Sequence, residues 1–187
     1  MKMLSFLLFF CAFSFDAFSG DIDYDNRQLI KALTKGAGSF ELNELEIPAS
    51  LAPNSEGKYF QVTGSGSSSI SFAYVGRVNS CRAGGCSAPG VEANSGFEYF
   101  DYYILFNTRG AVEQVKVFNY MATHGQEITL KAWLRQFQDH SVDQDLTVGK
   151  QVDGIAGATI SVHAITEDVR EKTALLRQLV EIQYTSN

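Results

Sequence analysis

The order of apolar and polar residues predicts paired β-strands in the first part of the chain. Two aromatic-rich segments flank a run of Gly and Ser at residues 64–68, which favours a hairpin with a mobile turn. Two more segments flank the turn signal at residues 108–110. In the second of these, Val115 and Val117 alternate with polar neighbours, as in a strand that buries one face. The predicted strands cover residues 59–62, 69–78, 97–107 and 111–120.

Three segments carry apolar residues at helical spacing. The first ends at Gly36, a typical helix stop. The second places an apolar stripe that includes Leu130 and Trp133 against the sheet, with Gln136 on the opposite, polar side. Strands grouped before helices indicate an α+β fold, with an antiparallel sheet of aromatic-rich hairpins packed against amphipathic helices. The predicted helices cover residues 24–34, 128–140 and 161–183.

The first residues have the pattern of a secretory signal peptide. Lys2 precedes an apolar run over residues 3–15, which is too short to span a bilayer. Small side chains favour cleavage after Ser19, so we expect a signal peptide at residues 1–19 and one mature domain at residues 20–187. The protein is then expected to be periplasmic or secreted, and no later segment is predicted to span a membrane.

The charge balance excludes some classes of partner. Fifteen Lys and Arg residues against 21 Asp and Glu give a formal net charge of −6, so the chain offers no broad basic face for nucleic acid. The three histidines, His124, His140 and His163, are scattered and show no metal-binding spacing. We therefore expect no nucleic-acid partner and no metal site. An acidic surface would favour a basic docking patch on a protein partner.

Two cysteines, Cys81 and Cys86, lie beyond the predicted signal peptide. Export favours a disulfide between them, and the intervening Gly84 and Gly85 allow the chain to turn back. Such a short ring would be a loop staple that constrains the unfolded chain only modestly. The alternative is a thiol pair that exchanges electrons with a neighbouring cofactor, which requires an accessible thiolate.

A run of small residues precedes the last predicted helix. Small side chains at residues 154 and 156–158 leave the hydroxyl of Thr159 unobstructed, so another protein's active site could close over it. A helix N-terminus offers unpaired backbone N–H groups and a positive dipole potential, which suits a phosphate. Asp153 adds a carboxylate upstream of the hydroxyl. A simpler alternative is that Thr159 or Ser161 only caps the helix and Asp153 only forms the turn.

The order Asp153-x-x-x-Gly157-Ala158-Thr159 resembles the flavinylation motif of the FMN-binding domain family. That family includes the G subunit of Rnf-type electron-transport complexes and the C subunit of sodium-translocating NADH:quinone reductase. One position departs from the usual pattern, because Ala156 stands where the motif has Ser or Thr, and this bears on how efficiently the motif is modified. The resemblance extends more loosely to the hairpin upstream, to residues 121–127 and to the last helix.

The resemblance implies a covalently bound cofactor. A periplasmic flavin transferase would use FAD and a divalent metal to attach FMN to Thr159 through a phosphoester, with Asp153 beside the acceptor hydroxyl. Gly157, Ala158 and Ser161 belong to the same cofactor-binding segment. The family's pattern also places His124 in a region close to the flavin. Aromatic side chains available to pack against the ring are Tyr99, Tyr102, Tyr103, Tyr120 and Trp133.

The function implied by the resemblance is electron transfer. The chain would be an exported FMN flavoprotein that relays electrons between membrane or periplasmic redox partners, with no small substrate required. Covalent attachment keeps the cofactor at a high local concentration outside the cytosol. One alternative is an unmodified, disulfide-stapled periplasmic binding or accessory module. Another is a flavin reductase that acts on a small molecule, which requires an open pocket beside the ring.

Overall fold

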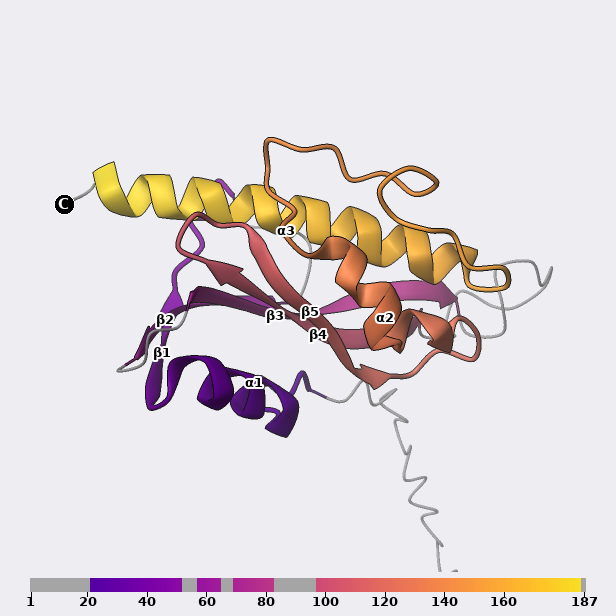
Figure 1. Cartoon of the computed structure of the whole chain (residues 1–187), viewed down its shortest axis with the longest axis horizontal. Coiled ribbons are helices and arrows are strands. Elements are labelled where there is room, and N and C mark those ends of the chain that lie inside the picture. Colours follow the sequence, from indigo (N-terminus) through magenta and orange to yellow (C-terminus); the bar gives the residue numbers. More distant parts are fainter. Residues whose placement is uncertain (1–20, 52–56, 65–68, 83–96, 186–187) are drawn as a thin grey trace, which may run out of the picture.

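The computed structural model describes residues 21–51, 57–64, 69–82 and 97–185. Within these residues, five strands form one antiparallel sheet in which each strand pairs with the next along the chain. Figure 1 shows one long helix, α3 (Thr159–Thr185), across one face of this sheet and a shorter helix, α1 (Arg27–Ala37), against the other. The strands are β1 (Phe40–Leu45), β2 (Gly57–Gly64), β3 (Ile70–Arg82), β4 (Phe97–Asn107) and β5 (Val112–Tyr120).

The α+β prediction is confirmed, and both predicted hairpins are present. β2 pairs with β3, for example through Tyr59 opposite Tyr74. β4 pairs with β5 across the predicted turn, where the Gly110 N–H donates to the Asn107 carbonyl at 2.9 Å. Several predicted features lie outside the described part of the chain. They are residues 65–68 of the Gly/Ser turn, the signal peptide, the side chain of Cys81 and the whole of Cys86.

The edge strand β1 was not predicted. Its sequence, FELNEL, places three polar side chains among three apolar ones and follows the helix directly. Glu and Asn have low strand propensity, so the composition of this segment does not favour a strand. Pairing with β2 over the whole of β1, from Phe40 opposite Gly64 to Leu45 opposite Tyr59, overrides that local preference.

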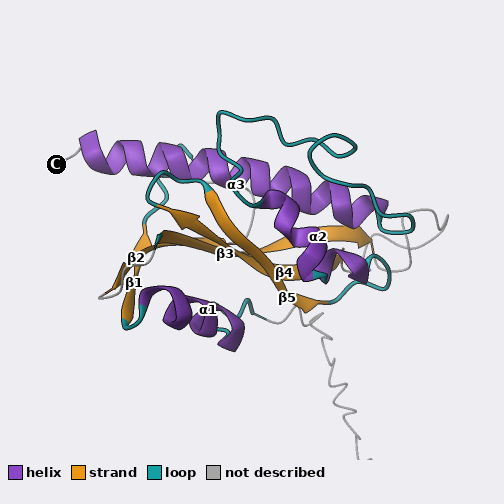
Figure 2. Cartoon of the chain, in the orientation of Figure 1, coloured by secondary structure: helices purple, strands orange, loops and turns teal. Residues whose placement is uncertain are grey.

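Both faces of the sheet are buried, each by a different helix (Figure 2). Along β4, Tyr102 and Ile104 belong to the core beneath α3, whereas Tyr103 and Leu105 belong to the core above α1. A strand covered on both sides has no polar face, so it reads as a nearly continuous apolar run. This explains the aromatic-rich sequence of β4.

Helix α1 begins and ends later than its sequence pattern predicts. The Asn26 side chain accepts a hydrogen bond from the Leu29 N–H at 2.9 Å and caps the N-terminus. At the other end, the Gly38 N–H donates to the Thr34 carbonyl at 3.1 Å, and the φ of Gly38 is +71°. The helix therefore passes through Gly36, which the sequence suggested as its stop, and ends at the next glycine.

The predicted helix over residues 128–140 is wrong as a continuous element. The chain forms a 3₁₀ turn η1 (Gln126–Thr129), a single helical turn α2 (Lys131–Leu134) and a second 3₁₀ turn η2 (Arg135–Phe137). Leu130 adopts extended backbone, with φ −66° and ψ 124°, and its side chain is 57% exposed rather than on the buried stripe. Trp133 and Phe137 are buried as expected.

The apolar stripe of α3 is confirmed. Val162, Ile165, Val169 and Leu176 are fully buried against the sheet, and Leu179 is nearly so. Figure 1 shows the helix running along the whole sheet, with its first turn at the end where the chain passes from β5 into η1. None of the helices in the described ranges is both long enough and apolar enough to cross a membrane.

Candidate functional site

Thr159 is the first residue of α3. The Val162 N–H donates to the Ala158 carbonyl at 2.9 Å, which makes Ala158 the N-cap residue. The N–H groups of the first three helical residues then have no carbonyl partner within the helix. Thr159 is exposed, whereas Ala158 is buried. The structure therefore presents an exposed threonine beside the positive end of a long helix.

A glycine turn sets the position of this hydroxyl. The Ala158 N–H donates to the Ile155 carbonyl at 3.0 Å, and between them Gly157 has a φ of +82°. This is the third position of a β-turn that requires positive φ, where a side chain would strain the backbone. The turn reverses the chain immediately before α3 and leaves Ala156 and Gly157 exposed. Gly157 is thus required by the backbone conformation that precedes Thr159.

The alternative in which Thr159 or Ser161 caps the helix is wrong. The capping position belongs to Ala158, whose side chain has no oxygen to accept a backbone N–H. Thr159 and Ser161 instead occupy the first and third helical positions. Both residues therefore lie inside the helix and not at the position before it.

Asp153 is held by its backbone and not by its side chain. Its carbonyl accepts a hydrogen bond from the Trp133 indole N–H at 2.9 Å, and its N–H donates to the Gln136 side-chain oxygen at 2.7 Å. Both partners come from the α2–η2 segment, and the Asp153 carboxylate is exposed. Gln136 was predicted to point away from the apolar stripe into solvent, but it turns to this loop. The sequence did not reveal this backbone clamp, because its two partners lie 17 and 20 residues away.

Ser161 is tied into a chain of hydroxyl groups. Its Oγ lies 2.9 Å from Ser80 Oγ and 3.1 Å from the Tyr120 hydroxyl, and the Tyr120 hydroxyl donates to the His124 carbonyl. Because Tyr120 uses its only proton for His124, Ser161 must donate to Tyr120 and accept from Ser80. The Ser161 proton is therefore engaged, and the side chain is buried. Of the two hydroxyl residues in the first turn of α3, only Thr159 is available to react.

Tyr120 anchors the loop that contains His124 to α3. Its ring stacks on Phe100 with centroids 5.8 Å apart and an angle of 12°. Burial raises the pKa of the Tyr120 hydroxyl, and the hydrogen bond to Ser161 opposes this. The neighbouring Gly125 has a φ of +88°, and a Cβ there would lie 2.7 Å from Ser161 Oγ. Glycine therefore allows residues 121–127 to approach α3, and the exposed His124 lies in this loop.

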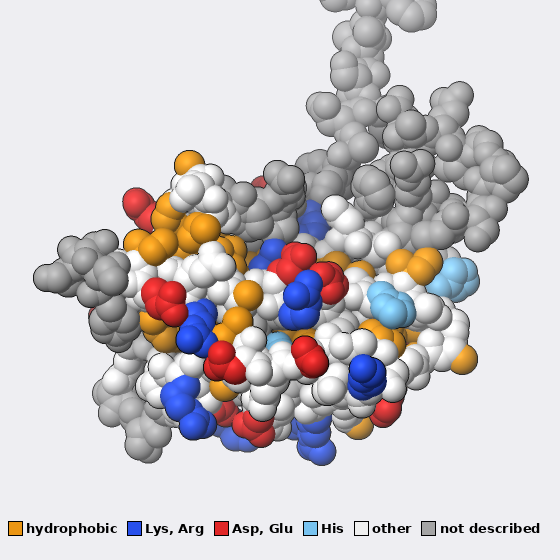
Figure 3. Space-filling view, turned by 90° about the horizontal axis from the view of Figure 1, so that it is seen from above, with side chains coloured by type: hydrophobic (Ala, Val, Ile, Leu, Met, Phe, Trp, Pro, Cys, Tyr) orange, Lys and Arg blue, Asp and Glu red, His pale blue; other side chains and the backbone are white. Residues whose placement is uncertain are grey.

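A hollow of about 240 Å³ opens beside Thr159. Small and aliphatic side chains line most of it, and His163 contributes its polar group. Figure 3 shows this face of the molecule, with charged side chains intermixed along its middle. Histidine and hydrophobic side chains lie together towards the right, the end at which α3 begins. The residues that line the hollow are Val148, Gly154, Ile155, Ala156, Thr159, Val162 and His163.

Only two of the five aromatic candidates lie next to this site. Tyr102 and Tyr103 are buried within the two cores and do not line the hollow beside Thr159. Tyr99 stacks with Arg77, whose guanidinium carbon lies 3.8 Å from the ring centroid. Tyr120 and Trp133 do contact the site, through Ser161 and through the Asp153 carbonyl. Their polar groups stabilise the surrounding loops.

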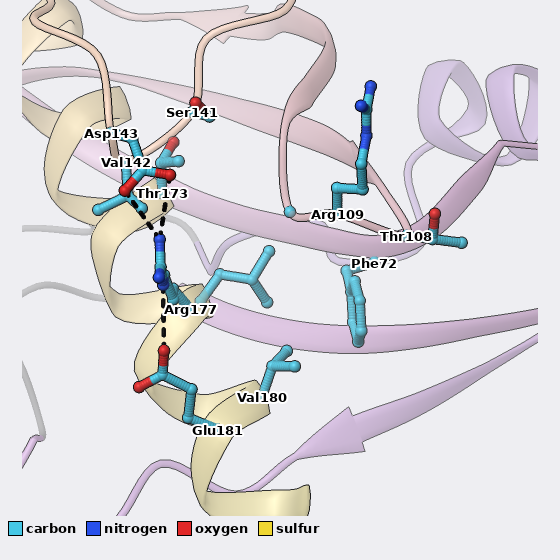
Figure 4. A pocket seen from close by; sticks show the side chains of 12 residues that line it. Phe72, Thr108, Arg109, Ser141, Val142, Asp143, Thr173, Arg177, Val180 and Glu181 are labelled. Atoms are coloured by element: carbon cyan, nitrogen blue, oxygen red, sulfur yellow. Dashed lines mark hydrogen bonds and ion pairs between the residues drawn. The ribbon is translucent and has the colours of Figure 1, made fainter.

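A second hollow on α3, of about 230 Å³, has different chemistry (Figure 4). Arg177 lies in it and forms ion pairs with Asp143 and Glu181, each at 3.0 Å. The figure shows the guanidinium group between the two carboxylates, with Phe72 and Val180 on the apolar side. The charge of Arg177 is therefore already compensated by carboxylates of the described chain.

The match to known proteins falls on the described site. Residues 99–173 match the model of the FMN-binding domain family. The matched segment begins in β4, ends in α3 and includes His124, Asp153, Thr159 and Ser161. No curated protein matches the chain. Residues 99–173 are therefore similar to the FMN-binding domain family, and this match supports a flavin-binding protein.

Proposed function

We propose that this protein is an exported electron-transfer flavoprotein that carries one FMN, linked through a phosphoester to Thr159. The observation that carries the proposal is the exposed Thr159 hydroxyl at the first residue of α3, within the segment that matches the FMN-binding domain family. The hydroxyl follows a glycine turn, and the side chains of the three residues that precede it are small. These features suit an acceptor on which a second enzyme must act.

The residues around Thr159 fit an attached phosphate. The N–H groups of the first helical turn point in the N-terminal direction, and the helix dipole favours negative charge there. Among the described residues, those that line the hollow beside Thr159 include no acidic side chain. Asp153 is fixed through its backbone by Trp133 and Gln136, so its exposed carboxylate belongs to a loop of defined position.

Attachment is a phosphoryl-type transfer in which this chain supplies the nucleophile. The Thr159 oxygen forms a bond to the FMN phosphorus of FAD, the pyrophosphate bond breaks, AMP leaves and the hydroxyl proton is removed. The transferase supplies the divalent metal, and Asp153 contributes a carboxylate to the joint site. Once attached, FMN supplies reversible electron uptake, and the chain's residues hold it where partners can reach it.

Electron relay is favoured over reduction of a small molecule. The hollow beside Thr159 measures about 240 Å³, whereas small-molecule sites usually span about 300–1,000 Å³. A carrier needs an exposed cofactor and no substrate pocket. An unmodified accessory module remains the second alternative, and it differs from the proposal in having no added mass on the mature chain.

Export and domain limits are part of the proposal. Residues 1–19 would be removed as a signal peptide, leaving residues 20–187 as one FMN-binding domain in the periplasm or outside the cell. The apolar run after Lys2 supports this. A transferase that acts outside the cytosol would then meet the domain after export.

The first experiment is intact-mass analysis of protein co-produced with a flavin transferase and exported. The wild type should gain the mass of one FMN less one water, and Thr159→Ala should gain none. Thr108→Ala, which alters another exposed threonine in a turn, is the matched control and should be modified normally. A wild type that stays unmodified, while a second substrate shows that the transferase is active, would favour the accessory module.

A second experiment tests the role of Asp153. Asp153→Asn keeps both backbone hydrogen bonds and removes only the carboxylate charge, so the fold should persist. Flavin attachment should slow by tenfold or more, which corresponds to a barrier raised by about 1.4 kcal/mol or more. Asp145→Asn changes another exposed acid of the same loop and should leave the rate unchanged. Equal rates in the two variants would remove Asp153 from the transfer step.

A further inference from the structure

A groove of about 510 Å³ runs along the edge strand β5, between α1 and the α2–η2 segment. Its floor is formed by Tyr103, Val115 and Leu134, and the Tyr103 hydroxyl accepts a hydrogen bond from the Gln114 side chain at 3.0 Å. Burial raises the pKa of Tyr103 to about 12, so this hydroxyl stays neutral. Figure 1 shows α1 and α2 on either side of this part of the sheet.

The lining of the groove is basic although the chain as a whole is acidic. Five of its side chains are cationic and only Glu113 is acidic, whereas the whole chain has a formal net charge of −6. None of the five forms an ion pair with another residue in the described part of the chain. Like charges along a concave surface reinforce one another's potential. The cations are Lys31, Lys35, Lys116, Lys131 and Arg135.

The groove and the Thr159 site share one structural element. Within the α2–η2 segment, Leu134 and Arg135 line the groove. Trp133 and Gln136 of the same segment bind the backbone of Asp153. A partner seated in the groove would therefore contact the segment that holds the loop before Thr159. The groove is therefore linked to the loop before Thr159 through the α2–η2 segment.

We propose that this groove is the docking surface for an acidic face of the protein that exchanges electrons with the flavin. This inference rests on the proposed function. Four of the five cations are lysines on flexible stems, drawn from three separate elements, which suits transient electrostatic docking more than recognition of one small anion. The overall negative charge of the chain favours a basic docking face on the partner. The basic groove instead requires that the partner's docking face be acidic.

The test measures reduction of the FMN-loaded protein by a small acidic iron–sulfur protein, reduced beforehand and freed of excess reductant. Each productive encounter oxidises one reduced cluster and passes one electron to the flavin, and protons come from solvent. The charge-reversal pair Lys31→Glu/Lys131→Glu should lower the second-order rate constant at low salt by about tenfold or more. High salt should remove most of the difference.

The matched control is Arg109→Glu/Lys150→Glu, which changes the net charge equally at exposed positions outside the groove. It should lower the rate constant by less than about threefold. Photoreduced 5-deazariboflavin, an uncharged donor, should reduce all variants equally. Equal losses in the two charge-reversal pairs would overturn the proposal. Tight binding of inorganic pyrophosphate with an unchanged iron–sulfur reaction would show a small-anion site and would also overturn it.

Failure of the proposed function is recognised separately, because the added flavin mass is measured first. If that mass is absent, an NMR titration of the same protein with an oligoglutamate peptide decides the character of the groove. Salt-sensitive shift changes at Lys31, Lys35 and Lys131 support an acidic docking surface. Their absence overturns it.

Discussion

Two hollows of nearly equal volume lie along α3, about 240 Å³ beside Thr159 and about 230 Å³ beside Arg177. The first is lined by small and aliphatic side chains around an exposed hydroxyl at the helix N-terminus. The second contains a guanidinium group already paired with Asp143 and Glu181. The two hollows therefore differ in the availability of a reactive group and not in volume.

The backbone explains why the two hollows along α3 differ. At Thr159, the preceding N-cap residue Ala158 has no side-chain oxygen to accept from the first N–H groups of the helix, which suits these groups to an anion. At Arg177, the chain is well inside the helix and its N–H groups are used by the helix itself. The half-exposed ion pairs there contribute little to stability because water screens them. The N-terminal hollow is the one suited to modification.

The largest predicted effect lies between the two hollows, where Lys172 fixes α3 on the sheet. Lys172 is 2% exposed and pairs with Asp168 at 3.3 Å, and Asp168 accepts a hydrogen bond from the Tyr102 hydroxyl. Lys172→Met leaves the Asp168 charge buried without this partner and should lower the free energy of unfolding by about 3–5 kcal/mol. Arg177→Met should lower it by about 0–1 kcal/mol. Urea denaturation measures the free energy of unfolding of both variants. Similar losses in Lys172→Met and Arg177→Met would contradict the comparison.

The next effect tests the packing of the His124 loop against the start of α3. Gly125→Ala combines a φ of +88° with a Cβ 2.7 Å from Ser161 Oγ, and should cost about 2–4 kcal/mol. Gly110→Ala has a similar φ of +75° but open space around the Cβ, and should cost about 1–2 kcal/mol. Thermal unfolding of the pair separates steric contact from backbone strain. Equal losses would mean that the loop does not pack closely on Ser161.

A smaller effect on stability, with a larger effect on modification, is expected at Gly157. Gly157→Ala meets open space but keeps a φ of +82°, so it should cost about 1–2 kcal/mol and slow flavin attachment by displacing Thr159. Gly154→Ala also meets open space, without positive φ, and should change stability by less than about 0.5 kcal/mol. Attachment rates from mass spectra provide the second readout. Normal attachment in Gly157→Ala would show that the turn does not position the acceptor.

The smallest predicted effect is a change in how stability depends on pH at His140. This residue directly precedes Ser141, which lines the hollow beside Arg177. Burial lowers the pKa of His140, and the nearby Arg170 lowers it further. The unfolded chain therefore binds a proton more readily, so this residue's contribution to stability is lost as the pH falls below the ordinary histidine pKa of about 6.5. His140→Gln should flatten the dependence of unfolding free energy on pH between neutral and mildly acidic conditions. An unchanged slope would contradict the assignment.

Much of the fold could be predicted because local periodicity reports which face of an element is buried. The stripe from Val162 to Leu179 and the alternation around Val115 follow from helical and strand geometry. β1 escaped prediction because an edge strand needs only one partner and tolerates Glu and Asn. The break in the helix at Leu130 was not predicted because the apolar residues around it keep helical spacing, although the backbone of Leu130 is extended.

The site could be predicted only where it is continuous in sequence. Small residues before Thr159 indicated an accessible hydroxyl, and the described turn agrees. The contacts that engage Ser161 but not Thr159 join residues far apart: Ser161 meets Ser80 and Tyr120, and these are 81 and 41 residues away. No local pattern encodes such contacts, so the engagement of the Ser161 proton required the structure.

The most direct test of the central claim is peptide mapping of the fully matured, exported protein after co-production with an active flavin transferase. Fragmentation of the peptide that contains both hydroxyl residues should locate the FMN phosphoester on Thr159, with Ser161 unmodified. A flavin on Ser161, or a Thr159 left unmodified in protein that the active transferase has processed, would contradict the account.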